Sequence, residues 1–242
     1  MARSTSRHWR PIALLTTAAM LSWCAPVAYP QGAAGAATVA VVEAGQARAR
    51  VVLPADAGSA LREAATTLVE GIRRRCGVGL EVVTEPAEAA PGLVALHCGR
   101  TTIAAAADLG LAGLDPDGFV IAVPDTRTVL LVGGSDAGTE YAIYDFLERY
   151  AGLRWLFPGA LGEVVPQSPD LRVPVTTVRS EPAFQHRLFS GLGKAEEGEH
   201  RGEQALWARR NRMRGRVQFH HNLWRLFLPE ELTATHPEVY PV

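Results

Sequence analysis

The residues that could carry out chemistry are scattered along this sequence and form no complete catalytic motif. Glu196, Glu197, Glu199 and Glu203 lie together in a segment rich in glycine and charge. Glycoside hydrolysis needs two carboxylates in fixed positions, whereas charged runs of this kind are usually solvated loops. The Gly-x-Ser-x-Gly motif of serine hydrolases is absent, and no cysteine has reactive surroundings. We therefore predict no catalytic residue in this chain.

A glycine-rich turn precedes an apolar helical pattern and could in principle bind a phosphate. It reads Gly-Gly-Ser-Asp-Ala-Gly over residues 133–138. The spacing fits neither a dinucleotide fingerprint nor a Walker loop, and no lysine follows. Asp136 would repel a phosphate at the start of the helix. We predict a turn whose Ser135 or Asp136 caps the helix, with no nucleotide partner and no cofactor.

Histidines near the C-terminus raise the question of a metal site. His220, His221, His236 and Glu238 are suitable ligand types. Adjacent histidines on a strand point to opposite faces, so His220 and His221 would not share one ion. We predict no metal ion here. A polar contact between this strand end and a hydroxylated ligand is the favoured interpretation.

Five arginines lie close together just before these histidines, at positions 209, 210, 212, 214 and 216. Such a cluster could bind nucleic acid, but the net charge of the chain is −1, and we predict no nucleic-acid partner. A solvated helix face is the favoured interpretation. The alternative is that one or two arginines contact a carboxylated sugar through paired hydrogen bonds.

The hydrophobic pattern predicts a layered α/β domain with a mixed sheet over residues 38–178. The expected helices are Ala57–Arg75, capped by Asp56 or Ser59 and ended by Gly77; Thr101–Leu109, capped by Thr102; and Ala137–Tyr150, stopped by Gly152. The expected strands are Thr38–Glu43, Arg48–Pro54, Leu80–Val83, Leu93–His97, Gly118–Val123 and Thr128–Val132. Extended pieces follow at Arg154–Phe157 and Glu163–Pro166, with Leu171–Val178 as a last strand or linker.

The N-terminus has the layout of a secretory signal. Three arginines precede the apolar run Ile12–Trp23, and small residues continue to Ala37. We expect a cleaved signal peptide over residues 1–37, an extracytoplasmic (secreted or periplasmic) protein, and contact with a membrane only through that signal. Two cysteines, Cys76 and Cys98, then remain; a disulfide and two buried thiols are both open.

The pattern changes after a group of prolines that ends at Pro182. Phe184–Phe189 is strand-like, Arg201–Arg214 is helix-like and Arg216–Phe219 is strand-like again. A complete (β/α) barrel takes roughly 250 residues. We expect residues 179–242 to begin such a barrel, truncated at Val242, with residues 183–242 sensitive to proteolysis and residues 38–178 resistant.

Several motifs resemble those of a known group of proteins. They are G-x-x-D-A-G-T-E-Y-A-I-Y-D-F-L-E-x-x-x-G-L-R-W from Gly133, then Gly162-Glu-Val-Val-Pro166 and Ser180-Glu-Pro-Ala-Phe184, and later W-A-R-R-N-R-M, H-H-N and H-P-E-V-Y. They are similar to exported bacterial proteins whose N-terminal domain is like that of xylan-acting α-glucuronidases and β-N-acetylhexosaminidases. In that group a barrel-like region of mostly unknown function follows.

The resemblance implies an accessory domain followed by the first strands of a barrel, with catalytic carboxylates downstream of this chain. Ligands meet barrels at the carboxyl ends of strands, so Arg187, His221 and Asn222 are the expected substrate contacts. Trp207 could stack on a sugar or lie in the core. The implied function is that of a glycoside hydrolase-like protein, α-glucuronidase-like if it acts on uronic-acid-bearing polysaccharide or oligosaccharide. The alternative is a non-catalytic carbohydrate-binding or cell-surface scaffold protein.

Overall fold

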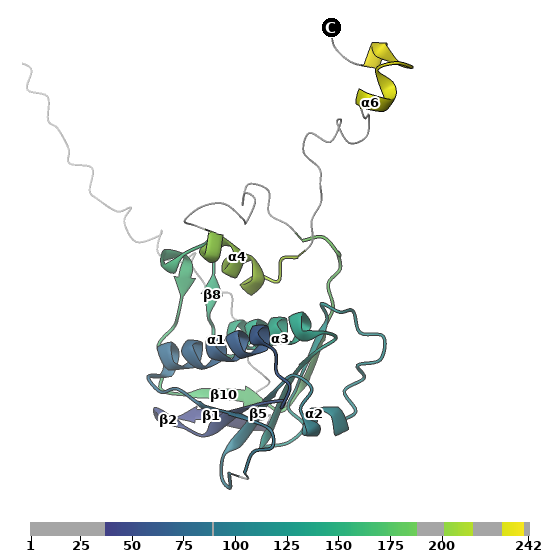
Figure 1. The fold of residues 1–242 in the computed structure, drawn as a ribbon. Coiled ribbons are helices and arrows are strands. Elements are labelled where there is room, and N and C mark those ends of the chain that lie inside the picture. Colours follow the sequence, from purple (N-terminus) through teal and green to yellow (C-terminus); the bar gives the residue numbers. More distant parts are fainter. Residues whose placement is uncertain (1–36, 89, 188–200, 215–228, 240–242) are drawn as a thin grey trace, which may run out of the picture. The chain divides into compact units, whose positions relative to one another are not determined.

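The computed structural model describes residues 37–88, 90–187, 201–214 and 229–239 (Figure 1). The expected signal peptide, residues 1–37, lies outside this range except for Ala37. Within the described part the chain forms a mixed α/β fold, as the hydrophobic pattern predicts. No helix in these ranges combines the length and apolar character that crossing a membrane requires.

A six-stranded mixed sheet forms the centre of the domain. Its strands are β3 (Ala49–Leu53), β4 (Glu81–Thr84), β5 (Val94–Cys98), β6 (Phe119–Ala122), β7 (Thr128–Gly133) and β11 (Thr177–Ser180). They are ordered β11-β6-β7-β5-β3-β4. The pairs β3–β4, β3–β5 and β5–β7 are parallel, while β6 pairs antiparallel with β7 and β11. The predicted β6–β7 hairpin is therefore confirmed.

Two smaller antiparallel sheets accompany the central one. One has the order β10-β1-β2, with β10 at Leu171–Pro174, β1 at Thr38–Glu43 and β2 at Gln46–Ala47. The other pairs β8 (Arg154–Trp155) with β9 (Glu163–Val164). The single strand expected over Leu171–Val178 is divided, because β10 pairs with β1 and β11 pairs with β6. This segment thus connects the central sheet with the smaller one.

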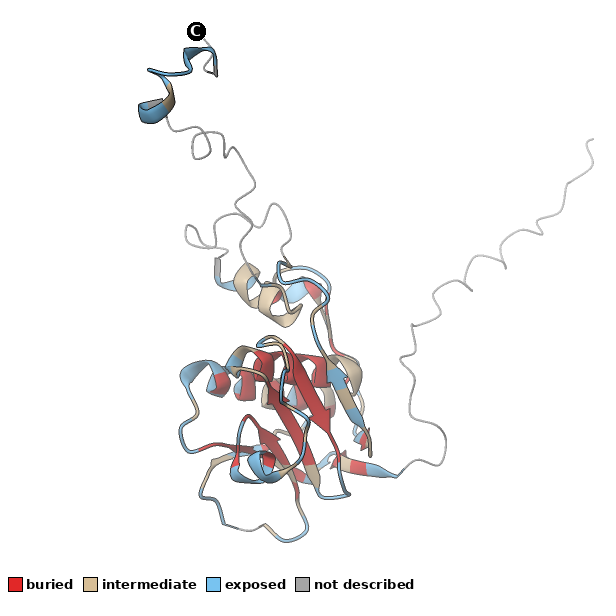
Figure 2. Ribbon diagram, turned by 90° about the vertical axis from the view of Figure 1, so that its right-hand side faces the viewer, coloured by how far each residue is buried: buried red, intermediate tan, exposed pale blue. Residues whose placement is uncertain are grey.

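Helices cover both faces of the central sheet, unequally. The helices α1 (Ser59–Cys76) and α3 (Asp136–Arg149) lie side by side over one face (Figure 1). The side chains between them and the sheet form the main core, which also includes Val39 and Val173 of the smaller sheet. The short α2 (Thr102–Ala106) and residues 107–114 cover part of the other face, over Val120, Ala122, Leu130 and Val132. Figure 2 shows the resulting buried strands.

Two predicted helix caps are wrong, and at α2 a tertiary contact accounts for the difference. Helix α1 begins after Gly58 without a side-chain cap, so neither Asp56 nor Ser59 has that role. Thr101, not Thr102, caps α2 by accepting from the Ala104 amide at 3.3 Å. The backbone amide of Thr102 instead donates to the Glu85 carboxylate. Ser135 caps α3 as predicted, and Gly77 ends α1 in the left-handed conformation, with φ +78°.

The described residues beyond Ser180 form α4 (Arg201–Arg210), α6 (Pro229–Leu232) and the 3₁₀ turn η2 (Pro237–Val239). Residues 184–187 of the expected strand Phe184–Phe189 form only an isolated antiparallel bridge, Arg187 with Arg214. The expected strand Arg216–Phe219 lies outside the described residues. The start of a barrel over residues 179–242 therefore stays a prediction.

Both cysteines of the described chain are buried free thiols. Burial raises the pKa of Cys98 to about 12, and it also raises the pKa of Cys76. Of the two alternatives left open by the sequence, the structure shows the thiols.

The glycine turn between β7 and α3 is held by direct backbone contact. A Cβ on Gly133 would lie 2.6 Å from the Cα of Gly138, and one on Gly138 would lie 2.8 Å from the Pro116 carbonyl oxygen. Gly134 is equally confined, by Asp115. None of these glycines has a positive φ, so close approach rather than an unusual turn conformation requires them.

Replacing Gly138 with alanine should destabilise the domain by about 2–3 kcal/mol, because the added methyl group overlaps neighbouring backbone that has no room to shift. Alanine is otherwise the better helix former by about 1 kcal/mol. Gly202→Ala is the matched control, since Gly202 is helical, exposed and open on all sides. Urea unfolding of both variants checks this. Equal free energies of unfolding for the two would contradict the contact argument.

Candidate functional site

The carboxyl end of the parallel strands is the first place where this fold could bind a ligand. The chain passes from β3 to β4 on one side and then to β5 on the other, so strand order reverses between β3 and β5. Open α/β sheets bind ligands at such a point. Here the side chains of Leu61 and Pro54 pack against Gly99. A Cβ added to Gly99 would lie 2.9 Å from the Leu61 side chain and 3.6 Å from that of Pro54. Apolar packing therefore occupies this position.

A hydroxyl, an imidazole and a carboxylate gather beside this point, on the opposite face of the sheet. Thr101 Oγ1 lies 3.0 Å from His97 Nδ1, and Glu85 binds the first amide of α2 at 3.0 Å. These are the residue types of a nucleophilic triad. However, Thr101 is completely buried and its hydroxyl already caps α2. The cluster fastens α2 to the sheet and offers no accessible nucleophile.

Burial lowers the pKa of His97, an effect that Arg50 reinforces and Glu85 opposes. A depressed pKa means that the folded state favours neutral imidazole. The stability that the folded state gains from neutral His97 is therefore fully present above pH 6.5, the ordinary pKa of histidine. This stability is lost as the pH falls through the lower pKa of His97 in the folded state.

We expect the free energy of unfolding to fall between pH 7 and pH 5.5, by up to about 1.4 kcal/mol per pH unit for the one proton involved. In His97→Asn, which cannot titrate there, this part of the slope should disappear. Urea unfolding of both proteins at several pH values in this range measures it. The same slope in both would assign the pH dependence to other groups.

The N-terminus of α3 is the second candidate, because helix N-termini bind anions. The three glycine amides of this turn have protein partners: Gly133 N donates to Thr139 Oγ1 at 3.0 Å, Gly134 N to Gly118 O at 2.9 Å, and Gly138 N to Ser135 Oγ at 3.3 Å. Ser135 Oγ in turn donates to the Pro116 carbonyl. The glycines close this turn against residues 115–118, which supports the prediction of a turn without a phosphate site.

Inorganic phosphate and pyrophosphate should therefore leave the melting temperature unchanged, relative to sodium chloride of equal ionic strength. A bound ligand at 100 times its Kd would add about 2.7 kcal/mol, which thermal unfolding detects readily. A concentration-dependent rise with pyrophosphate alone, absent in Ser135→Ala, would contradict the assignment.

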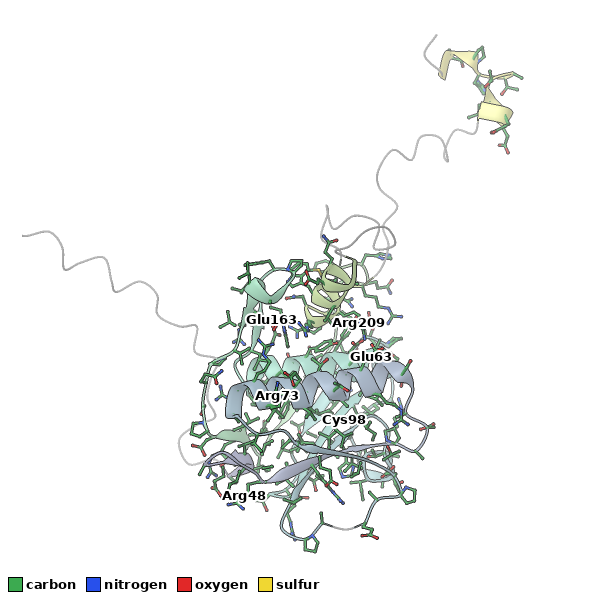
Figure 3. All side chains as sticks on the ribbon, turned by 60° about the vertical axis from the view of Figure 1, so that its left-hand side comes forward. Arg48, Glu63, Arg73, Cys98, Glu163 and Arg209 are labelled. Carbon is green, nitrogen blue, oxygen red and sulfur yellow. The ribbon has the colours of Figure 1, made fainter. Side chains whose placement is uncertain are left out.

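The arginine run is the third candidate, and the favoured prediction of a solvated helix face is confirmed only in part. The described arginine side chains are 17–52% exposed, but they also form ion pairs. Each arginine of the run that the structure describes is paired with a carboxylate of the α/β domain. The ion pairs are Arg209–Glu140, Arg210–Glu163, Arg212–Glu148 and Arg214–Asp117. These four carboxylates are only 7–12% exposed. Figure 3 shows Glu63, Glu163 and Arg209 where α4 meets the domain.

Two tryptophans form the apolar centre of this contact. Trp207 of α4 is buried and donates from Nε1 to the Trp155 carbonyl at 3.0 Å. The guanidinium of Arg210 lies 5.2 Å from the centre of the Trp155 ring, a cation–π geometry. Tyr144 packs edge-on against Trp155. Trp207 is thus part of the core, as the more conservative of its two interpretations predicts.

Small pockets flank the Trp155–Arg210 pair. One, of about 160 Å³, lies between α4 and the β8–β9 hairpin and is lined by Phe157, Glu203 and Leu206 among others. The second, of about 140 Å³, lies against α1 beside Thr67 and Arg74. Pockets for drug-sized ligands measure roughly 300–1,000 Å³. These two are smaller than such sites.

Of the predicted substrate contacts, the structure describes only Arg187; His221 and Asn222 lie outside the described residues. Arg187 Nη2 is 2.6 Å from Asp117 Oδ2, and Arg187 Nε donates to the Arg212 carbonyl at 2.8 Å. Its backbone bridges that of Arg214. A sugar contact at Arg187 stays a prediction, and in the present structure this side chain ties residues 184–187 to the end of α4.

The remaining sequence candidates are described only in part. Glu196, Glu197 and Glu199 are outside the described residues, while Glu203 lines the 160 Å³ pocket. His236 Nδ1 lies 3.2 Å from Glu238 Oε1. Among the residues that the structure describes, no group of three or more histidine, cysteine or acidic side chains could hold a metal ion.

Sequence reasoning missed the carboxylates that receive the arginines. One signal for them was present: Glu140, Tyr144 and Glu148 are spaced by four and therefore share one face of α3. Tyr144 donates to Glu140 at 2.6 Å. A charged face on a helix that is otherwise buried indicates a partner of opposite charge.

Neither a protein-family model nor a curated protein matches the sequence. Solved structures give faint likenesses. An N-acetyl-β-hexosaminidase from Streptomyces plicatus has a TM-score of 0.41 at 16% identity, over 63% of this chain and 25% of that one. An exo-β-N-acetylglucosaminidase from Vibrio harveyi gives 0.37 at 14%, over 62% and 18%. A family GH115 4-O-methyl-α-glucuronidase gives 0.36 at 13%, over 57% and 18%.

All of these TM-scores are below 0.5, so the likenesses establish neither a shared fold nor a function. This chain spans only about a fifth to a quarter of each of those structures.

Proposed function

We propose that this chain is the N-terminal part of an exported glycoside hydrolase-like protein that acts on or binds polysaccharide. Its α/β domain is a non-catalytic companion, and the catalytic carboxylates belong to sequence downstream. The motifs between Gly133 and Pro166, which resemble those of exported proteins with α-glucuronidase-like N-terminal domains, support the carbohydrate assignment. Uronic-acid-bearing polysaccharide is the substrate class that the resemblance favours.

The observation that carries the companion role is the state of the carboxylates. A glycosidase needs a carboxylic acid whose pKa is raised beside a second, free carboxylate. Glu163 has the opposite property: burial alone would raise its pKa, but Arg74 and Arg210 outweigh burial and lower it. Glu140, Glu148 and Asp117 are likewise held by arginines. These groups neutralise cations within the domain and are not available to a substrate.

The β8–β9 hairpin supports a companion role from another direction. Leu156, Phe157, Leu161 and Val164 are exposed on it, Leu161 at 92%. The hairpin is closed by Leu156 N donating to the Gly162 carbonyl at 2.8 Å, and Gly162 has no space for a side chain. A rigid apolar projection is typical of a surface that packs against another part of a protein.

The test is to read the coding DNA past the codon for Val242 and to express the longer product. We expect the longer product to cleave or retain a glucuronic-acid-substituted xylan. The 242-residue chain, assayed as the matched control, should release no sugar from that xylan or from nitrophenyl glycosides.

Three outcomes separate the possibilities. Cleavage by the 242-residue chain itself would overturn the non-catalytic role of the domain. A longer product that retains polysaccharide without cleaving it would favour the carbohydrate-binding scaffold. A longer product that neither cleaves nor retains any polysaccharide tested would overturn the carbohydrate assignment.

A further inference from the structure

Helix α4 is attached to the domain by one buried tryptophan, Trp207, and by a set of ion pairs. Among its described side chains only that of Trp207 is buried, and Figure 2 shows most of the helix as intermediate. The ion pairs come from three separate places: α3 supplies Glu140 and Glu148, β9 supplies Glu163, and the loop before β6 supplies Asp117. Electrostatic attachment of this kind at a partly exposed surface is weakened by salt.

The rest of the domain is held together without α4. Helices α1 and α3 pack on the central sheet through apolar side chains such as Leu68, Ile143 and Phe146. If α4 left, Glu140 and Glu148 would meet water again. Glu163 would keep its ion pair with Arg74, and Asp117 would keep its pair with Arg187. The large penalty for breaking a buried ion pair arises only when one partner stays buried, so it does not apply to the departure of the whole helix.

The docked helix also carries unfavourable features. Arg210 Nε and Arg212 Nη1 are buried without a hydrogen-bond acceptor, and a buried donor without a partner is destabilising. Arg212 has φ +57°, the left-handed conformation that glycine normally adopts after a helix. Backbone bonds from Arg212 N to Arg209 O and from Met213 N to Ala208 O fix this conformation. These costs offset part of the ion-pair stabilisation.

We propose that α4 is a reversible strap, which releases from an otherwise folded domain when its ion pairs are weakened. Release opens the acidic face formed by Asp117, Glu140, Glu148 and Glu163, together with the ring of Trp155. It also removes the wall that α4 supplies to the 160 Å³ pocket. The proposal concerns the domain alone and is independent of the carbohydrate assignment.

Hydrogen exchange of the whole 242-residue chain, read by mass spectrometry, tests the strap. Peptides from α4 are compared with peptides from α1 and α3 at 50 mM and 1 M sodium chloride. We expect α4 to be protected at low salt and to exchange about tenfold faster at high salt, because the Debye length falls to about 3 Å at 1 M. Exchange in α1 and α3 should be unchanged, since local opening leaves them folded.

Charge variants assign the effect to the ion pairs. Arg209→Glu should increase α4 exchange at 50 mM salt to at least the high-salt rate and should weaken its salt dependence. Combining it with Glu140→Arg should restore part of the protection. Arg73→Gln is the matched control, because Arg73 makes an exposed pair with Glu70 on α1 and should leave α4 exchange unchanged. If Glu140→Arg does not fold, Arg209→Glu alone still decides.

Two results would overturn the strap. If α4 exchanges only as slowly as α1 and α3 at both salt concentrations, the helix is an integral part of one cooperative unit. If α4 is unprotected even at 50 mM salt, the ion pairs do not hold it. Unchanged α4 exchange in Arg209→Glu would likewise remove the electrostatic basis.

Discussion

The backbone contact between the β7–α3 turn and residues 115–118 fixes the position of α3, and much of the domain follows from it. Gly133 and Gly138 bring strand and helix together more closely than any side chain would permit. Helix α3 then closes the core with one side and presents Glu140 and Glu148 to α4 with another. A shift of this turn would therefore affect both the packing of the sheet and the attachment of α4.

The elements themselves could be predicted from sequence because each is encoded locally. Strand β1 has the expected bounds, Thr38–Glu43, and α1 differs from expectation by two residues or fewer at its ends. Local pattern does not determine which hydroxyl becomes a cap. At α2 the Thr102 amide donates to Glu85, a residue from another part of the chain. Similarly, no local signal divides residues 171–178 between two sheets, because the choice depends on which partner strand lies alongside.

The role of the arginine run could not be predicted, because its partners are distant in sequence. Arg209 and Glu140 are 69 residues apart, and Arg214 and Asp117 are 97 apart. A run of arginines with no visible acceptor has the composition of a solvated face, and the same residues form ion pairs, with side chains 17–52% exposed, once the fold supplies carboxylates. The turn at Gly133–Gly138 and its Ser135 cap, in contrast, were predictable, because the glycines and the capping hydroxyl are local in sequence.

The two core thiols have a consequence for how the folded domain meets oxidants. Burial raises the pKa of Cys98 to about 12, which disfavours its thiolate, and thiolate is the form that oxidants attack. Native packing does not require Cys76 and Cys98 to be oxidised. The folded domain therefore shields both thiols from oxidants, and they fill space in the core as small apolar side chains.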